Sequence, residues 1–171
     1  HFKKLKDCRD RLEQFFGPVS ALPTSQRGPI LVQLPGNQGK DIAKLDAFLA
    51  DLKDVTSPER WKVAIEFRHE GWLCRETYEV LDRHRAAICL HDMPPARVTS
   101  SNDAAFVYVR RHGPGGDYRG SYSEGAIQQD ARRIRDWLNE GRMVFVYFNN
   151  DAEACAVDDA QRLKDAIGES G

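Results

Sequence analysis

The chain has 171 residues, of which 41% are hydrophobic and 30% charged, and 25 basic and 26 acidic side chains give a formal net charge of −1. This composition is typical of a globular domain that can bury a core, and the balanced charge gives no strong signal for a nucleic-acid partner or a membrane surface. No apolar run approaches the roughly 20 residues of a membrane span and no signal peptide is visible, so we expect no membrane partner.

Helix and strand patterns alternate along the chain. Apolar residues at three- and four-residue spacing predict helices, and short apolar stretches that end in polar residues predict strands. In chain order we expect helix 2–17, ended by Gly17-Pro18, strand 29–36, helix 41–53, strand 63–69, helix 74–84, strands 86–94 and 105–113, helix 123–140, strand 143–151 and helix 156–167. The link 95–104 is rich in turn residues and shows no helical stripe.

Side chains alternate between two faces along a strand, and this divides each predicted strand into an apolar face and a face that becomes polar near the strand end. We place Val63, Ile65 and Phe67 on the apolar face of their strand. In strand 86–94 we place Asp92 inward, with Cys89 and His91 outward. The predicted inward polar residues are Gln33, Glu66, Arg68, Asp92, Tyr108, Arg110, His112, Tyr147 and Asn149.

The alternation of helices and strands predicts a parallel α/β sheet, for which two architectures compete. An open doubly wound sheet would have strands that are apolar on both faces. Charges from several strands that converge on one interior suit a TIM-like (β/α) barrel better, although such a barrel normally needs about 250 residues. We therefore expect one α/β barrel domain over 1–171, the C-terminal five-strand portion of a barrel that lacks about its first three strands.

Six segments carry a resemblance to a known family. They are QLP at 33–35, EFRHEGW at 66–72, Asp92, YVRRHG at 108–113, GSYSEG at 120–125 and YFNND at 147–151. In order and spacing they resemble the YecE-like family, a domain of unknown function numbered seventy-two in its series. The resemblance covers essentially the whole chain and implies a TIM barrel, but it implies no particular reaction. The chain departs from the family pattern at Gly36 and Arg111, neither of which has inward parity.

Three predicted site residues have acid/base chemistry. Glu66 and Arg68 share a face at a strand end, which fits either a carboxylate acid/base beside an anion-binding arginine or a buried ion pair. His112 is a candidate base or metal ligand, because its ordinary pKa lies near neutrality. Asp92 is either a second carboxylate opposite Glu66 or a cap of the following turn.

The remaining predicted site residues would bind substrate: Gln33, Arg68, Trp72, Tyr108, Arg110, Tyr147 and Asn149. Arg110 can hold a carboxylate or phosphate in bidentate fashion, or neutralise an acid across the barrel. Trp72 can stack on a sugar or base, or cover the end of the barrel. The glycine-rich segment 112–122 is either a phosphate-binding lid or a plain surface loop.

Metal and cofactor chemistry have weaker support. Glu66, Asp92 and His112, with His1, are residue types that bind Mn²⁺, Zn²⁺ or Mg²⁺, but inward-facing arginines repel cations, and we expect no metal and no cofactor. The cysteines Cys8, Cys74, Cys89 and Cys155 form no CxxC pair, which indicates reduced thiols and a cytoplasmic protein.

The favoured prediction is an enzyme that acts on a small polar or anionic substrate (phosphorylated, carboxylated or sugar-like) by acid/base chemistry at the C-terminal mouth of the barrel. Hydrolase, isomerase and lyase reactions all fit this residue set. The alternatives are a non-catalytic module that binds a ligand or a nucleic-acid end, and a metal-dependent phosphoesterase or sugar isomerase.

Overall fold

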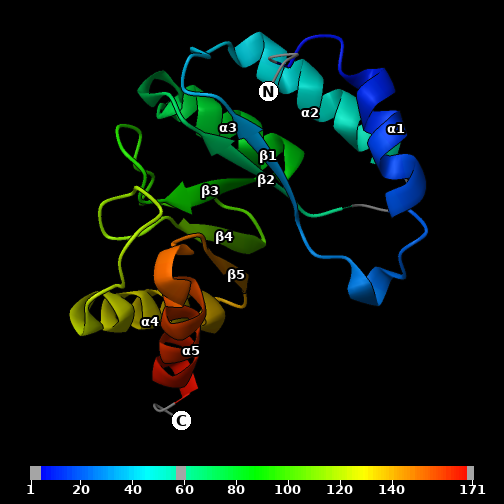
Figure 1. The fold of residues 1–171 in the computed structure, drawn as a ribbon. Helices are drawn as coiled ribbons and strands as arrows, with labels where there is room; N and C mark the ends of the chain where they lie inside the picture. The colour runs from blue at the N-terminus through cyan, green and yellow to red at the C-terminus, as the bar shows by residue number, and fades with distance from the viewer. Residues whose placement is uncertain (1–4, 57–60, 169–171) are drawn as a thin grey trace.

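A computed structural model describes residues 5–56 and 61–168, in which strands and helices alternate (Figure 1). The strands are β1 (Ile30–Leu34), β2 (Val63–Phe67), β3 (Ala87–His91), β4 (Phe106–Arg111) and β5 (Met143–Phe148). The α-helices are α1 (Arg9–Val19), α2 (Ile42–Thr56), α3 (Arg75–His84), α4 (Glu124–Asn139) and α5 (Cys155–Gly168). Short 3₁₀ turns occur at Thr24–Gln26, Glu70–Trp72 and Ala152–Ala154. Within the described ranges, none of the helices combines the length and apolar character needed to span a bilayer.

The five strands form one parallel sheet in the order in which they occur along the chain, β1-β2-β3-β4-β5. The register pairs Ile30 with Val63 and Phe106 with Met143, so the carboxyl ends of the strands lie along one edge. The sheet is open, because β1 and β5 lie at its two ends and do not pair with each other. The predicted parallel α/β sheet is therefore confirmed.

The helices lie on one face of the sheet. Val63, Ile65 and Phe67 of β2 join side chains of α1, α2 and α3 in one apolar cluster. Val144 and Val146 of β5 pack against a second cluster made by α4 and α5. Figure 1 shows the same grouping, with α1 to α3 beside β1 and β2, and α4 and α5 beside β5. The alternative architecture, an open doubly wound sheet, needs helices on both faces of the sheet, so this arrangement excludes it for the described residues.

The opposite face of the sheet is lined by strand side chains. Its apolar part is a cluster of small and aromatic residues, Ala64, Ala87, Cys89, Phe106 and Tyr108. Polar residues follow this cluster toward the carboxyl ends of β1, β2, β4 and β5, as the alternation predicted. The open face therefore carries an apolar base and a polar outer edge.

The link between β3 and β4 has no helix, as its composition predicted. Val98 pairs with His91 through a short antiparallel bridge. Asn102 ties the link to the start of β3. Its Oδ1 accepts a hydrogen bond from the Ile88 backbone N–H at 2.8 Å, and its Nδ2 donates to the Ala86 carbonyl. The link is thus fixed by polar contacts to the neighbouring strand.

The predicted end of the first helix is wrong. Helix α1 runs from Arg9 through Gly17 and Pro18 to Val19, so the predicted start is also too early for residues 5–8, and residues 2–4 of the prediction lie outside the described residues. Proline lacks a backbone N–H, but in the last turn this removes a single helical hydrogen bond. The backbone N–H of Ser20 still donates to the Phe16 carbonyl at 2.8 Å and that of Ala21 to the Pro18 carbonyl at 3.3 Å, and these bonds close the helix two residues later than predicted.

Candidate active site

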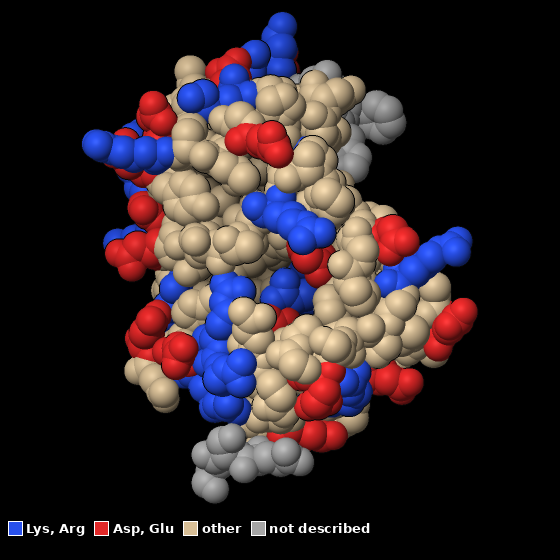
Figure 2. Space-filling view, turned by 90° about the vertical axis from the view of Figure 1, so that its left-hand side faces the viewer, with Lys and Arg blue, Asp and Glu red and all other residues tan. Residues whose placement is uncertain are grey.

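The candidate site lies on the open face of the sheet at the carboxyl ends of the strands. Figure 2 views the molecule from the side toward which the β3 arrow points in Figure 1, and the centre of this side is hollowed, with basic and acidic side chains at its floor. Gln33 of β1 pairs in register with Glu66 of β2, and Arg68 follows two residues later on the same face. Arg110 of β4 reaches this group from the other side of β3. Three separate strands therefore bring the predicted polar residues together.

Glu66 is the centre of the group and is fully buried. Its Oε1 accepts a hydrogen bond from Arg68 Nε, and its Oε2 accepts one from Arg110 Nη1 at 2.6 Å. Burial alone raises the pKa of Glu66, but the hydrogen bond and charge of Arg110, with the charge of Arg68, outweigh burial and lower it. Glu66 is therefore an ionised carboxylate whose two oxygens each hold one guanidinium group.

The two arginines keep hydrogen-bonding capacity for a ligand. Arg110 also donates from Nε to Asn149 Oδ1 at 3.1 Å and from Nη1 to Gln33 Oε1 at 3.3 Å. Within residues 5–56 and 61–168, no hydrogen bond is formed by Arg110 Nη2 or by Arg68 Nη1. The side chains of Arg68 and Arg110 are 12% and 15% exposed, whereas Glu66 beneath them is 0% exposed. A ligand that approaches from solvent would meet two guanidinium groups before it met the carboxylate.

His112 and Asp92 form a second polar unit beside Arg68. Asp92 Oδ1 accepts hydrogen bonds from the His112 backbone N–H at 2.9 Å and from His112 Nδ1 at 3.2 Å. Because a carboxylate only accepts, Nδ1 carries the imidazole proton and the Nε2 lone pair faces Arg68 Nη2 at 3.3 Å. Tyr122 donates its hydroxyl proton to Asp92 Oδ2 and accepts a hydrogen bond from the Gly113 N–H at 2.7 Å.

The ionisation of Asp92 follows from these contacts. Burial raises its pKa, but the hydrogen bonds from His112 and Tyr122 outweigh burial and lower it. Burial, and then the hydrogen bond to Asp92, raise the pKa of Tyr122. At neutral pH Asp92 is therefore a carboxylate and Tyr122 a neutral donor, which fixes both the tautomer and the orientation of His112.

The glycine-rich loop after β4 covers His112, which is fully buried. The ring of Tyr118 meets the imidazole edge-on, with 5.3 Å between ring centroids. Gly113 has a φ of +94°, and a Cβ at that position would lie 2.2 Å from the Arg119 carbonyl oxygen. The loop can therefore fold back over His112 because residue 113 has no side chain.

Contacts with the start of α5 anchor the far end of this loop. Ser121 Oγ donates to Asp159 Oδ1 at 2.6 Å, and Asn150 Nδ2 donates to the Gly120 carbonyl at 2.8 Å and to Asp159 Oδ2 at 2.7 Å. Asp159 and the nearby Glu124 are acidic, and Ser123 already caps α4 through its hydrogen bond from Ala126 N–H. The structure gives no support to the phosphate site that the loop composition suggested at this helix start.

The predicted faces of β3 are wrong. Ala64 pairs in register with Ala87, so Cys89 lies on the same face as Glu66, and its Sγ is 3.8 Å from Glu66 Oε2. His91 faces the same side, with its ring centroid 6.1 Å from that of His112. Ile88 and Leu90 instead join the cluster under the helices. Asp92 still reaches the site, because it lies beyond the last residue of β3 and bonds to the loop after β4.

His91 occupies the floor of the site as a neutral imidazole. Its Nε2 lies 2.9 Å from the Phe67 carbonyl oxygen, which only accepts, so Nε2 carries the proton. Its Nδ1 is buried and has no hydrogen-bond partner among the described residues. Burial lowers the pKa of His91. Burial, and then the charge of Glu66, raise the pKa of the Cys89 thiol well above its ordinary value, so Cys89 stays protonated.

The predicted aromatic residues divide between the two faces. Trp72 is fully buried, donates from Nε1 to the Gln38 carbonyl at 2.9 Å and stacks on Phe67 with 4.9 Å between centroids. It belongs to the helix-covered core, where a substrate at the open face would not touch it. Tyr108 and Tyr147 lie on the open face and stack on each other, again with 4.9 Å between centroids.

The described residues contain no group of three His, Cys, Asp or Glu side chains arranged to hold a metal ion. The predicted set of Glu66, Asp92 and His112 does not converge, because Arg68 lies between Glu66 and His112. His1 lies outside the described residues. The positively charged guanidinium of Arg68 thus lies where a cation bound by both Glu66 and His112 would have to lie.

Sequence reasoning missed the part played by Tyr122 and the inward position of His91. Tyr122 lies within the GSYSEG segment that carried the family resemblance, but nothing in its spacing linked it to Asp92. His91 is the last residue of β3, whose other side chains are apolar on both faces, so the alternation gave no signal for the face on which His91 lies.

Comparison with known proteins agrees with this fold. The model of a family described as "Protein of unknown function DUF72" matches residues 1–171. A crystal structure of a DUF72 family protein from Thermotoga maritima has 23% sequence identity and a TM-score of 0.82, and the match covers 97% of this chain and 68% of that chain. Two crystal structures of a DUF72 family protein from Enterococcus faecalis have 17% and 18% identity, with TM-scores of 0.81 and 0.76. These two matches cover 97% and 92% of this chain, and each covers 68% of the Enterococcus faecalis chain. No curated protein matches the chain.

Proposed function

The chain belongs to the DUF72 family of proteins of unknown function, and we propose that it is an enzyme that acts on a small polar, anionic substrate by proton transfer at His112. One observation carries the proposal. Arg68 bonds both to the buried carboxylate of Glu66 and to His112 Nε2 at 3.3 Å. An anionic group bound by Arg68 would therefore lie beside the imidazole nitrogen that has a lone pair.

In this proposal Arg68 and Arg110 hold the anionic group of the substrate. Guanidinium groups bind carboxylates and phosphates through paired, charge-assisted hydrogen bonds, for which Arg110 Nη2 and Arg68 Nη1 are available. Glu66 holds the two guanidinium groups together. The sequence predicted Glu66 as the acid/base, but we assign it this holding role because its oxygens are engaged and its pKa is lowered.

His112 would accept a proton from the substrate at Nε2 and return it in the second half of the reaction. Asp92 would stabilise the imidazolium through Nδ1–H, and Tyr122 would hold Asp92 in place. Gln33, Tyr147 and Asn149 would orient the remainder of the substrate. Hydrolase, isomerase and lyase reactions all use a proton transfer of this kind.

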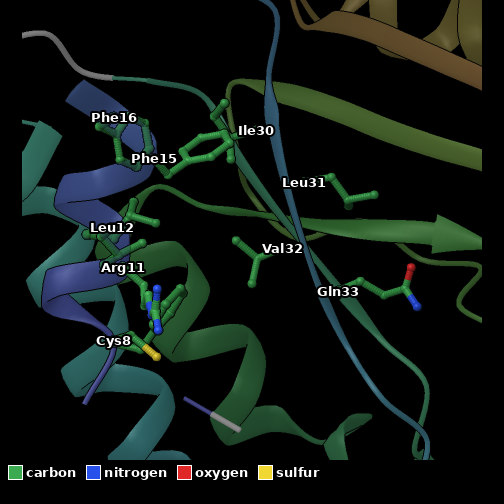
Figure 3. Close-up of a pocket in the computed structure, with 11 residues that line it drawn as sticks. Cys8, Arg11, Leu12, Phe15, Phe16, Ile30, Leu31, Val32 and Gln33 are labelled. Carbon is green, nitrogen blue, oxygen red and sulfur yellow. The ribbon is translucent and has the colours of Figure 1, made fainter. Parts of the chain in front are cut away.

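We propose further that the five strands are part of a TIM-like barrel. Strands in sequential order with helices on one face are the arrangement found in a (β/α) barrel. A groove of about 770 Å³ runs along the unpaired edge of β1, where Leu12, Phe15 and Phe16 of α1 face Ile30 and Val32 (Figure 3). Because α1 precedes β1, the strand before α1 in a barrel would occupy this groove. The solved relatives have about a third of their length outside the match, which is enough for such strands.

The test is a turnover screen of phosphorylated and carboxylated metabolites with the wild type and two site variants. His112→Gln should abolish turnover of whatever substrate the screen finds, and Arg110→Met should weaken its binding. His69→Gln and Arg75→Met, which change exposed residues outside the site, are the matched controls and should keep full activity. Full turnover by His112→Gln would refute the assignment of proton transfer.

One observation favours the second candidate, a non-catalytic module that binds an anionic ligand. The two arginines are partly exposed, whereas the loop covers His112 completely. This candidate predicts that a ligand stabilises the protein against heat without itself changing chemically, and that Arg110→Met removes the stabilisation.

A further inference from the structure

We propose that the ligand of the arginine pair carries a ring next to its anionic group, and that Tyr147 is the surface on which this ring stacks. The inference rests on the proposed binding of an anion by Arg68 and Arg110, and it narrows the class of ligand. It does not depend on whether the ligand is then chemically changed.

The first observation is an exposed aromatic surface inside the candidate site. Tyr147 and Tyr108 stack with 4.9 Å between centroids and 24° between ring planes. Tyr108 is 6% exposed, but Tyr147 is 41% exposed. Because Tyr108 covers one face of the Tyr147 ring, the exposed area of Tyr147 lies on its other face and edge. A rigid aromatic ring backed by a second ring is a firm stacking surface.

The second observation is the position of this surface beside the anion-binding group. Tyr147 is the register partner of Arg110 on the neighbouring strand. Neighbouring strands lie about 4.8 Å apart, so a ring stacked on Tyr147 would bring its substituent to the guanidinium of Arg110 if one or two bonds separate them. Arg110 Nη2 has no partner among the described residues and would receive the anion.

The third observation is the polar group at the edge of this surface. Asn149 follows Tyr147 by two residues and so shares its face, and its Oδ1 accepts from Arg110 Nε at 3.1 Å. This contact assigns Oδ1 of the amide to Arg110 and leaves Nδ2, which has no hydrogen-bond partner among the described residues, as a donor for a ligand. A phosphorylated sugar ring, or an aromatic ring with an anionic substituent, would satisfy the arginine, the ring surface and the amide together.

Calorimetric titration of the full chain with three phosphate monoesters tests the proposal. Methyl phosphate has the anion without a ring, phenyl phosphate adds an aromatic ring, and glucose 6-phosphate adds a sugar ring. We expect at least one ring-bearing ester to bind about tenfold or more tightly than methyl phosphate, a size typical of stacking on an aromatic side chain. Which of the two it is identifies the ring as aromatic or saccharide.

Variants link the preference to Tyr147. Tyr147→Val should remove the preference, so that the three esters bind with equal affinity, whereas Tyr147→Phe, which keeps the ring, should retain it. Arg110→Met should lower the affinity for all three esters. Circular dichroism of each variant shows whether it is folded. If Tyr147→Val does not fold, Tyr147→Phe still tests the inference, because loss of the ring preference in Tyr147→Phe contradicts a stacking role.

The outcomes separate this inference from the proposed enzyme. Equal affinity for the three esters, or a ring preference that persists in Tyr147→Val, would overturn the inference and leave the catalytic proposal standing. A ring preference that depends on Tyr147, without turnover of any metabolite in the screen of phosphates and carboxylates, would support the inference and refute the enzyme in favour of the binding module. Absence of binding by all three esters would refute both.

Discussion

Replacing Glu66 with glutamine tests the central contact of the site. The side chain is fully buried and holds Arg68 through Oε1 and Arg110 through Oε2, with 2.6 Å to Arg110 Nη1. Glutamine has nearly the same shape, but its amide nitrogen must face one of the two guanidinium groups as donor against donor. Removal of one charge from a buried pair costs about 3–5 kcal/mol. Because both arginines are partly exposed to water and one acceptor remains, we expect Glu66→Gln to lower the free energy of unfolding by about 2–3 kcal/mol.

Equilibrium unfolding in urea between pH 3 and pH 8 measures this loss. The folded-state pKa of Glu66 is lowered, so its contribution to stability is complete above the ordinary pKa of about 4.3 and is lost as pH falls through the lowered value. The difference between wild type and variant should therefore be constant from pH 6 to pH 8 and shrink below about pH 4. Glu79→Gln, which breaks an exposed ion pair with Arg75, is the control and should change nothing measurable. A Glu66→Gln variant as stable as the wild type at pH 7 would show that the carboxylate does not hold the arginines.

Three further predictions concern the floor of the site, its loop and the orientation of His112. Burial lowers the pKa of His91, so the free energy of unfolding of the wild type should fall as pH drops below about 6.5, by up to about 1.4 kcal/mol per pH unit. His91→Gln should lack this loss, whereas the control His69→Gln should retain it. Equal pH slopes for the two variants in urea unfolding would contradict this prediction. Gly113→Ala should destabilise the protein by more than about 1 kcal/mol, because the added Cβ would collide with the backbone of Arg119, and the displaced loop should let His112 react faster with diethyl pyrocarbonate. The control Gly39→Ala, whose added Cβ would have no atom within 4 Å, should have neither effect. Tyr122→Phe should shift the His112 tautomer away from Nδ1–H in long-range ¹⁵N–¹H NMR spectra, since Asp92 Oδ2 loses the hydroxyl that orients the carboxylate toward His112. An unchanged spectrum would exclude a positioning role.

The faces of β2, β4 and β5 could be predicted from the sequence because a physical alternation is present in them. In β2, for example, Ile65 and Phe67 belong to the helix side and Glu66 to the open side. Strand β3 lacks this alternation, because its five residues are all buried and apolar side chains occur on both faces. The prediction used Asp92 to fix the register of its faces, but Asp92 lies after the strand, where the two-residue period no longer applies.

The proton-transfer unit could not be predicted from strand periodicity, because a loop assembles it. Tyr122 reaches Asp92 across 30 residues of sequence, and this contact requires the chain to reverse direction after β4 with residue 113 at positive φ. Composition identified the loop as glycine-rich, but it does not say which side chain the loop would cover. The departure from the family pattern at Arg111 has a physical account, because its guanidinium pairs with Asp130 of α4 on the helix side.

Arg68 connects the two halves of the site and bears on the choice between enzyme and binding module. In the structure one of its N–H groups occupies the Nε2 lone pair of His112, which is the atom that would have to accept a proton. A ligand anion competes for the same guanidinium, because charge-assisted hydrogen bonds to an anion are stronger than those to a neutral imidazole. Binding of the anion would thus draw Arg68 away from His112 and free the base only when a substrate is present. A simple binding module has no need of an imidazole whose tautomer is fixed by a carboxylate and a tyrosine, and this is the physical reason to prefer the enzyme.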